Sequence, residues 1–261
     1  VQPLNPRSLR PLVDDKLTCK QKLQDHGVAV PETLAELSGF RDLAGLEGQM
    51  TRWDRGFVAK PAQSSGGQGI LVVTKGQEGD WLQPTRRGPR RLDGDAIREH
   101  LAQILSGMYT SGKSRDRAFV EELVRPEAGL ADLGGGGLPD VRIILHKCRP
   151  MQAMLRVATG IGVDLETGET VRAICEGRPV ERHPDSGGRL VGRKVPLWDE
   201  VTNAALRSAE AFELAYLGVD IVLDVERGPL VLEVNARPGL AIQLANGRGL
   251  REILRELELE R

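Results

Sequence analysis

The stretch Tyr216–Leu240, YLGVDIVLDVERGPLVLEVNARPGL, decides how the rest of the chain is interpreted. It contains two runs rich in Val, Ile and Leu, Gly218–Asp224 and Pro229–Asn235. Between them lies the polar tripeptide Glu226-Arg227-Gly228, which is typical of a turn. The stretch therefore predicts a β-hairpin.

Acidic and amide side chains interrupt both strands of this hairpin. Asp220 and Asp224 share one face of the first strand, because side chains alternate along a strand, and Glu233 and Asn235 share one face of the second. With an even-numbered turn, Asp220 lies opposite Glu233 and the oxygens meet. Facing carboxylates repel each other unless a cation lies between them, and Mg²⁺ prefers carboxylate and phosphate oxygens. The hairpin predicts a Mg²⁺-nucleotide site; the alternative is a strand cap at Asp220 and a solvated Glu233.

A glycine-rich segment, Ser64–Gly69 (SSGGQG), is the second chemical signal. It lies between two predicted strands, Phe57–Pro61 and Ile70–Thr74, and glycine allows such a loop to turn several backbone N–H groups toward an anion. Lys60 precedes the loop, and an unpaired buried ammonium is costly, so a phosphate oxygen is a natural partner. No helix follows, so the loop is neither a Walker A nor a dinucleotide motif. A plain turn with an incidental lysine is the alternative.

Length and composition exclude several other classes of protein. The 261 residues carry a net charge of −1 and only 3% aromatic side chains, which argues against nucleic-acid binding by charge or base stacking. No apolar run is long enough to cross a membrane. The three cysteines are widely separated and show no metal or redox spacing, which favours a reducing cytoplasm.

The remaining pattern predicts an α+β protein rather than a doubly wound parallel sheet. We expect an N-terminal arm over 1–12, a first subdomain over 13–117 with the glycine loop, and a second subdomain over 118–261 with the metal-binding hairpin. Helices are expected over 13–26, 32–50, 95–108, 199–216 and 250–259, a loop over 77–91, and paired strands over 140–148 and 151–159 around Arg149-Pro150.

Taken together, these features resemble the ATP-grasp superfamily, and within it the RimK-like α-L-glutamate ligases. The resemblance runs from Asp14 to Leu240, and VDIVLDVERGPLVLEVNARPGL is its most specific part. It implies an α+β fold in which two subdomains clamp ATP. Only fifteen residues precede Lys16, so the usual further N-terminal α/β domain is not expected, and a protein partner could supply the acceptor surface.

The resemblance implies an ATP-dependent carboxylate–amine ligation through an acyl phosphate, with an amino acid such as glutamate as one substrate. By position, the Mg²⁺ (or Mn²⁺) ligands, two ions in the family, would be Asp220, Glu233 and Asn235. The ATP-binding residues would be Lys16, Lys60, the lid residues Ser64, Ser65, Gly66, Gly67 and Gly69, the hinge residues Glu121, Glu122, Leu123 and Val124, and Asp140. Arg142 and Arg237 would act on the transferring phosphoryl group or the acidic substrate.

Each assignment has a structural alternative. Lys16 could be a solvated helix lysine, Glu121 and Glu122 the exposed end of an edge strand, and Arg142 part of a structural ion pair. Arg237 could bind an acidic substrate or pair with Asp224. The four histidines are interpreted as structural, and the RRGPRR run as a solvated loop.

One departure from the family pattern concerns catalysis. RimK-like proteins carry a basic, Asn-containing loop after the strand that matches 151–159, whereas here Ala158-Thr159-Gly160-Ile161 runs straight on. Two rivals to a ligase therefore stay open: a catalytically degenerate nucleotide-binding module and an ATP-grasp phosphotransferase.

Overall fold

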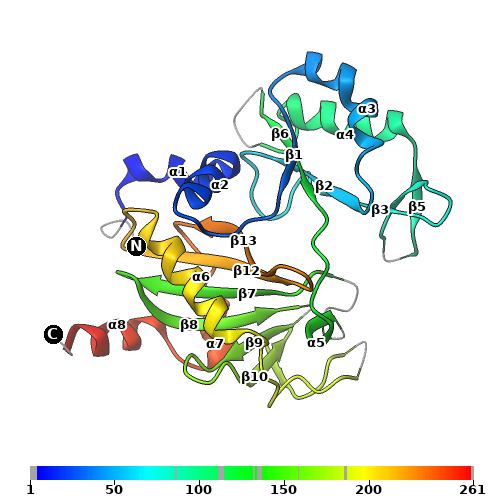
Figure 1. Cartoon of the computed structure of the whole chain (residues 1–261). Coiled ribbons are helices and arrows are strands. Elements are labelled where there is room, and N and C mark those ends of the chain that lie inside the picture. The colour runs from blue at the N-terminus through cyan, green and yellow to red at the C-terminus, as the bar shows by residue number, and fades with distance from the viewer. Residues whose placement is uncertain are drawn as a thin grey trace. The chain divides into compact units, whose positions relative to one another are not determined.

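The computed structural model describes residues 5–85, 87–110, 115–131, 133, 137–157, 159–184 and 187–259. These residues form two compact units, each with its own antiparallel sheet and helices, so the α+β prediction is confirmed (Figure 1). One unit comprises Asp15–Leu17 and Pro31–Val124; the other comprises Val1–Asp14, Thr18–Val30 and Arg125–Arg261. This division differs from the expected segments, because 118–124 belongs to the same unit as 31–117 and 18–30 belongs to the same unit as 125–261.

The first unit, called here the lysine unit, contains a six-stranded sheet in the order β1-β6-β2-β3-β4-β5. Its strands are β1 (Thr33–Leu37), β2 (Gly56–Pro61), β3 (Leu71–Lys75), β4 (Trp81–Gln83), β5 (Arg90–Leu92) and β6 (Ala118–Glu122). The 3-10 helix η2 (Phe40–Gly45) and the helices α3 (Leu46–Met50) and α4 (Gly94–Leu105) pack against it.

Two expectations for this unit are wrong. The segment 32–50 is not one helix, because Thr33–Leu37 pairs with β6 as a strand and only the remainder is helical. The expected loop over 77–91 contains β4 and β5, which extend the sheet beyond β3. In both places pairing with a neighbouring strand overrides the local pattern.

The second unit, called here the carboxylate unit, contains a seven-stranded sheet in the order β11-β10-β9-β8-β7-β12-β13. Its strands are β7 (Asp140–His146), β8 (Arg149–Arg156), β9 (Gly160–Val163), β10 (Thr170–Cys175), β11 (Arg178–Val180), β12 (Tyr216–Asp224) and β13 (Gly228–Asn235). Its helices are η1 (Arg7–Leu9), α1 (Pro11–Asp14), α2 (Lys16–Asp25, mostly in this unit), α5 (Ala128–Ala131), α6 (Trp198–Glu210), α7 (Ile242–Asn246) and α8 (Leu250–Leu259).

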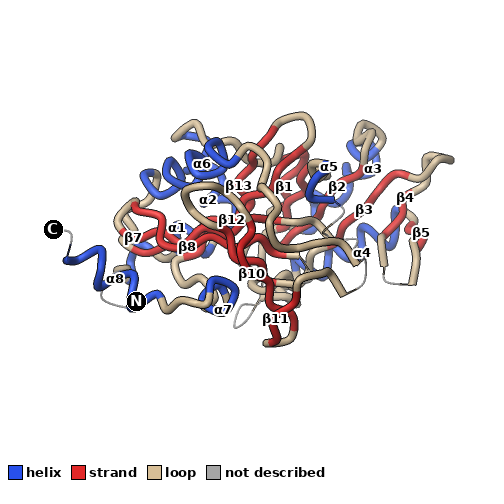
Figure 2. The backbone as a smooth tube through the Cα atoms, turned by 90° about the horizontal axis from the view of Figure 1, so that it is seen from below, coloured by secondary structure: helices blue, strands red, loops and turns tan. Residues whose placement is uncertain are grey.

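Helices cover both faces of the seven-stranded sheet. Helix α6 packs on one face, and α7 and α8 pack on the other, as the view in Figure 2 shows. Cross-strand register fixes which side chains share a face, because directly paired residues point the same way. The row Ile221–Val141–Leu155–Ile161–Ala173 faces the main core under α6. The row Glu233–Asp220–Arg142–Met154–Gly162–Arg172 faces the side of α7.

Two expectations for this unit, the position of one turn and the end of one helix, are corrected. The β7–β8 turn is Lys147-Cys148, not Arg149-Pro150, and both turn residues have positive φ (49° and 58°), as a two-residue hairpin with a type I′ turn requires. Helix α6 ends at Glu210 rather than near 216, because Tyr216 already begins β12.

Asn5 anchors the N-terminal arm to this sheet. Its buried side-chain amide donates to the carbonyls of Tyr216 and Ala236 and accepts from the N–H of Tyr216 at 3.1 Å. This contact could not be predicted from the sequence, since a single Asn among prolines carries no periodic signal.

Gly162 allows α7 to lie directly on the sheet. A Cβ at this position would lie 2.5 Å from the carbonyl oxygen of Ala245, which is backbone and cannot move aside cheaply. We expect Gly162→Ala to destabilise the carboxylate unit by about 1–3 kcal/mol, as overpacking does. Urea denaturation monitored by hydrogen exchange in β8 and β9 measures the effect.

Gly249→Ala is the matched control for that variant, because no atom lies closer than 4.0 Å to a Cβ at Gly249. Equal stability of the two variants would mean that α7 does not pack tightly on β9.

Candidate functional site

The predicted hairpin forms, and Asp220 lies directly opposite Glu233. The turn length and the register that produce this pairing differ from those expected. The turn between Asp224 and Gly228 has three residues, 225–227, and a β-bulge between the Asp220 and Ile221 pairs shifts the register, since Ile221 pairs with Val231. The bulge inserts one residue, Leu232, and returns Glu233 to the face of Asp220.

Asp220 is the centre of a charged cluster on the α7 side of the sheet. Its side chain is only 3% exposed and receives a bidentate pair from Arg142, with Nε–Oδ1 at 2.7 Å and Nη2–Oδ2 at 2.6 Å. Arg156 adds a third contact, Nη2–Oδ2 at 2.7 Å. The amide of Asn235 lies 3.5 Å from Asp220 Oδ2. Four adjacent strands thus direct polar groups to one spot.

Asp140 and Arg156 complete this cluster. Arg156 Nε lies 3.0 and 3.1 Å from the two carboxylate oxygens of Asp140, and its Nη2 contacts the same group. Burial raises the pKa of Asp140, an effect that the neighbouring Arg156 partly offsets. Burial opposes the charge of Arg156, but Asp140 and Asp220 outweigh it and raise the pKa of Arg156. Arg156 is a site residue that the sequence analysis missed.

The oxygen-bearing side chains of the hairpin fit a hard divalent cation that takes phosphate oxygens as its further ligands. Within the part of the chain that the structure describes, no three His, Cys, Asp or Glu side chains cluster as a self-sufficient metal site. Asp220, Glu233 and Asn235 nevertheless bring two carboxylates and an amide to adjacent positions of one hairpin. Mg²⁺ commonly takes one or two carboxylates and fills its other positions with water and phosphate oxygens.

The loop that follows β13 lies over the cluster. A Cβ at Gly218 would meet the ring of Pro238 at 2.6 Å, and a Cβ at Gly239 would lie 3.7 Å from Arg142 Nη1. Glycine at position 218 therefore lets residues 236–239 fold back across β12. Arg237 is exposed within this loop and makes no ion pair with any residue that the structure describes.

Asp224 does not join the cluster, and it does not pair with Arg237. Its carboxylate accepts hydrogen bonds from the N–H groups of Arg125 (3.0 Å), Glu226 (2.9 Å) and Arg227 (3.1 Å). Burial raises the pKa of this carboxyl, but these N–H groups outweigh burial and the net pKa is lowered. Asp224 holds the hairpin turn.

We therefore expect acid to weaken the hairpin through Asp224. Because its pKa is lower in the folded state, its stabilising contribution is present above the ordinary value of 3.8 and is lost as the pH falls through the folded value. Asp224→Asn should flatten this acid dependence of unfolding. If the free energy of unfolding depends on pH in the same way for the variant and the original protein, Asp224 does not stabilise the turn.

In the lysine unit, the structure gives Lys60 a protein partner. Lys60 on β2 forms an ion pair with Glu121 on β6, and their side chains are 13% and 5% exposed. Burial of Lys60 therefore does not by itself require a phosphate. Glu121 is buried within the sheet rather than at an exposed strand end.

Lys16 lies at the base of the glycine loop. Its Nζ donates to the carbonyl oxygen of Ser64, so it is not simply a solvated helix lysine. Gly66, Gly67 and Gly69 have φ values of 64°, 74° and 73°. Nothing lies near a Cβ at the first two, so conformation alone requires glycine there. Gly69 also packs on the ring of Tyr109. Residues 65–68 are exposed, as a phosphate-covering loop would be.

The expected hinge segment lies where the chain passes from one unit to the other. Glu122 accepts a hydrogen bond from the N–H of Glu32 at 2.7 Å and ends β6. Leu123 and Val124 follow, and the unit boundary comes directly after Val124.

The basic loop that RimK-like proteins carry after this strand has no counterpart among the described residues between β8 and β9, in line with the departure noted from the sequence. Arg156 pairs directly with Gly160, and the N–H of Val157 donates to the carbonyl of Thr159 at 3.0 Å, which makes a tight hairpin. Ala158 lies outside the described residues. The cation at this end of β8 is Arg156 itself.

Comparison with known proteins identifies the fold. A family model described as "Sugar-transfer associated ATP-grasp" matches residues 1–259. The structure is similar to those of D-cycloserine synthetase DcsG (TM-score 0.55, 14% identity), the D-alanine–D-alanine ligase of Bacillus anthracis (0.54, 15%) and the ATP-grasp ligase PsnB (0.54, 16%). No curated protein matches the sequence.

These alignments cover nearly all of this chain and about two thirds of the others. They include 97%, 95% and 98% of this chain and 73%, 66% and 61% of the synthetase, the ligase and PsnB respectively. At such low identity the likeness establishes the fold alone. In the described residues, no helix is long and apolar enough to span a membrane.

Proposed function

The chain belongs to the sugar-transfer-associated ATP-grasp family, and on that premise we propose that it is an ATP- and Mg²⁺-dependent ligase joining a carboxylate to an amine. The observation that carries the proposal is the placement of Asp220 opposite Glu233 beside two arginines. The solved structures of similar fold include a ligase in complex with ATP and one with Mg and ADP. The RimK-like, glutamate-adding type is the finer form of the proposal and rests on the ending of the sequence.

In the proposed reaction, a carboxylate oxygen of the acid attacks the γ-phosphorus of ATP, giving an acyl phosphate and ADP. The amine then attacks the acyl carbon, phosphate leaves, and the nitrogen loses a proton. Bound Mg²⁺ would neutralise phosphate charge, held by Asp220, Glu233 and Asn235. Arg142 and Arg156 place two positive charges beside them, which suits stabilisation of charge on a phosphoryl group or an acidic substrate.

The lysine unit would bind phosphates through Lys60, Lys16 and the exposed loop over Ser65–Gln68. The backbone of Leu123 and Val124, together with Asp140, would contact the nucleoside. Arg237, exposed beside the cluster, is proposed to meet the acidic substrate. A cytoplasmic location is also proposed, which suits three cysteines that form no disulfide among the described residues.

Phosphate release tests the proposal. The protein is incubated with ATP, Mg²⁺ and panels of acids with and without amines, and the products are identified by mass spectrometry. Release only when acid and amine are both present supports ligation. A stable phosphorylated acid would instead indicate a phosphotransferase.

The tight β8–β9 hairpin favours one rival, a nucleotide-binding module without turnover. Tight ATP binding with no product from any acid and amine would support this rival and contradict the ligase.

We expect Lys60→Met to weaken ATP binding by about tenfold or more, because a charged donor to phosphate is removed. Calorimetric titration with a non-hydrolysable ATP analogue measures the affinity. Lys75→Met is the matched control, since Lys75 lies on β3 of the same unit over Trp81. Unchanged affinity in a folded Lys60→Met variant would leave Lys60 as a purely structural partner of Glu121.

A further inference from the structure

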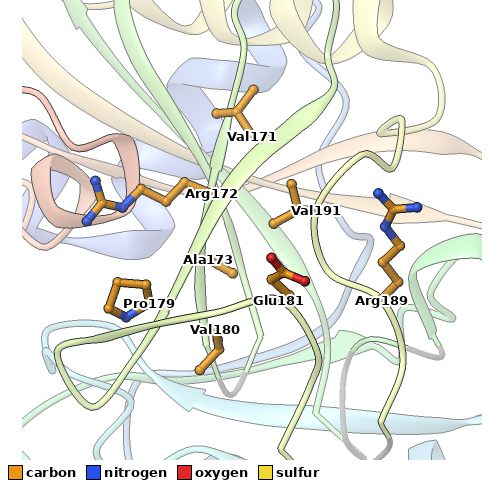
Figure 3. A pocket seen from close by; sticks show the side chains of 8 residues that line it. All are labelled: Val171, Arg172, Ala173, Pro179, Val180, Glu181, Arg189 and Val191. Carbon is orange, nitrogen blue, oxygen red and sulfur yellow. The ribbon is translucent and has the colours of Figure 1, made fainter.

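A cavity lies at the β10–β11 end of the seven-stranded sheet, whereas the Asp220 cluster lies on β7, β8, β12 and β13. Its volume is about 410 Å³, and β10, β11 and the segment 189–191 line it (Figure 3). Two backbone contacts hold the segment in place. The N–H of Leu190 donates to the carbonyl of Glu181 at 2.9 Å, and the backbones of Arg182 and Arg189 form an isolated antiparallel β-bridge. The cavity is therefore a built feature of the fold.

The cavity shares only part of its lining with the face of the charged cluster. Ala173, which lines it, belongs to the register row that ends at Ile221, one residue away from Asp220 and on the opposite face. Arg172 and Pro179 lie on the face of Asp220 instead, because Arg172 belongs to its row and Pro179 pairs with Ile174, two residues further along β10. The guanidinium of Arg172 extends toward α7, where a Cβ at Gly247 would lie 2.5 Å from it. A ligand in the cavity would not meet the atoms that the proposed ligation uses.

The lining is chemically asymmetric. Most of it is aliphatic, contributed by Val171, Ala173, Pro179, Val180 and Val191. Val171 is 50% exposed, a large fraction for a valine on a paired strand. Against this surface stand one carboxylate, Glu181, and one guanidinium, Arg189, on the same side as Val191 (Figure 3). Small-ligand sites typically combine an apolar wall with a few polar groups that fix orientation.

From this arrangement we propose that the cavity binds a free α-amino acid with an aliphatic side chain. Glu181 receives the ammonium group, Arg189 receives the carboxylate, and the valines contact the side chain. A planar guanidinium suits a carboxylate, and each charged hydrogen bond adds selectivity for the zwitterion. The site goes beyond the proposed ligase reaction and serves as an accessory or regulatory site for an amino acid.

Calorimetric titration with L-leucine, without ATP or Mg²⁺, tests this site independently of ligation. Two analogues serve as probes: 4-methylpentanoate, which lacks the amine, and 3-methylbutylamine, which lacks the carboxylate. We expect each to bind at least about tenfold more weakly than leucine. Equal affinity of leucine and 4-methylpentanoate, or no binding of leucine at millimolar concentration, would overturn the proposal.

Variants locate the bound amino acid. Glu181→Gln should weaken the binding of leucine about tenfold and leave the binding of 4-methylpentanoate unchanged. Arg189→Gln should also weaken the binding of leucine about tenfold, but leave the binding of 3-methylbutylamine unchanged. Glu213→Gln, an exposed carboxylate of the same unit, is the matched control. Leucine binding that survives Glu181→Gln but is lost in Asp220→Asn would place the ligand at the other site and contradict the inference.

Discussion

Glu233→Gln should lower Mg²⁺-dependent ATP turnover by about a hundredfold or more, because an amide replaces the carboxylate that faces Asp220 and the metal loses a charged ligand. The free energy of unfolding should change little, since Glu233 is only partly buried and glutamine has the same shape. Initial rates of ADP formation, measured across a range of Mg²⁺ concentrations, give the effect.

Glu213→Gln makes the same chemical change on an exposed loop of the carboxylate unit and should retain full activity. If Glu233→Gln turns over ATP at the original rate, Glu233 is not a metal ligand, and the proposal that this hairpin binds Mg²⁺ is contradicted.

Asp220→Asn should have a large effect on stability as well as on activity. The variant leaves Arg142, whose side chain is 13% exposed, and Arg156 without the carboxylate between them. Breaking a buried pair on one side commonly costs about 3–5 kcal/mol, because the remaining charge is uncompensated. Hydrogen exchange in β7 and β12 under increasing urea measures the loss.

A double variant separates charge from packing. Asp220→Asn combined with Arg142→Met should recover part of the lost stability, because it removes the charge of Arg142, whereas Arg156 keeps its ion pair with Asp140. Asp25→Asn, at an exposed carboxylate of the same unit, should be close to neutral. A stable Asp220→Asn single variant would show that the cluster is not held by this carboxylate.

Much of the carboxylate unit could be predicted from the sequence, because its elements carry strong local signals. The hairpin runs are long and rich in Val, Ile and Leu, and they form β12 and β13. Helix α8 (Leu250–Leu259) also lies where the pattern places it. The facing of Asp220 and Glu233 was expected too, but through an even-numbered turn.

The feature that produces this facing could not be derived from the sequence. A three-residue turn would by itself place Leu232 opposite Asp220, and only the bulge at Leu232 restores the pair. A bulge leaves no mark in a pattern of alternating apolar residues, because one extra residue in a strand depends on the packing of both sheet faces.

Contacts between residues far apart in the sequence could not be predicted either. Arg156 ends an apolar strand and its contacts with Asp140 and Asp220 depend on the register of β7, β8 and β12. Lys60 was expected to need a phosphate because Glu121, sixty-one residues away, is not a visible neighbour in the sequence. Strand β1 has too weak a local preference to be separated from the helices that follow it.

Binding of Mn²⁺ tests the central claim most directly, because this ion can replace Mg²⁺ and its free form is visible by electron paramagnetic resonance. Titration of Mn²⁺ into the protein with a non-hydrolysable ATP analogue should show tight metal binding that requires the nucleotide and is lost in Glu233→Gln but kept in Glu213→Gln. Equal Mn²⁺ binding by the original protein and the Glu233→Gln variant would contradict a metal site on this hairpin.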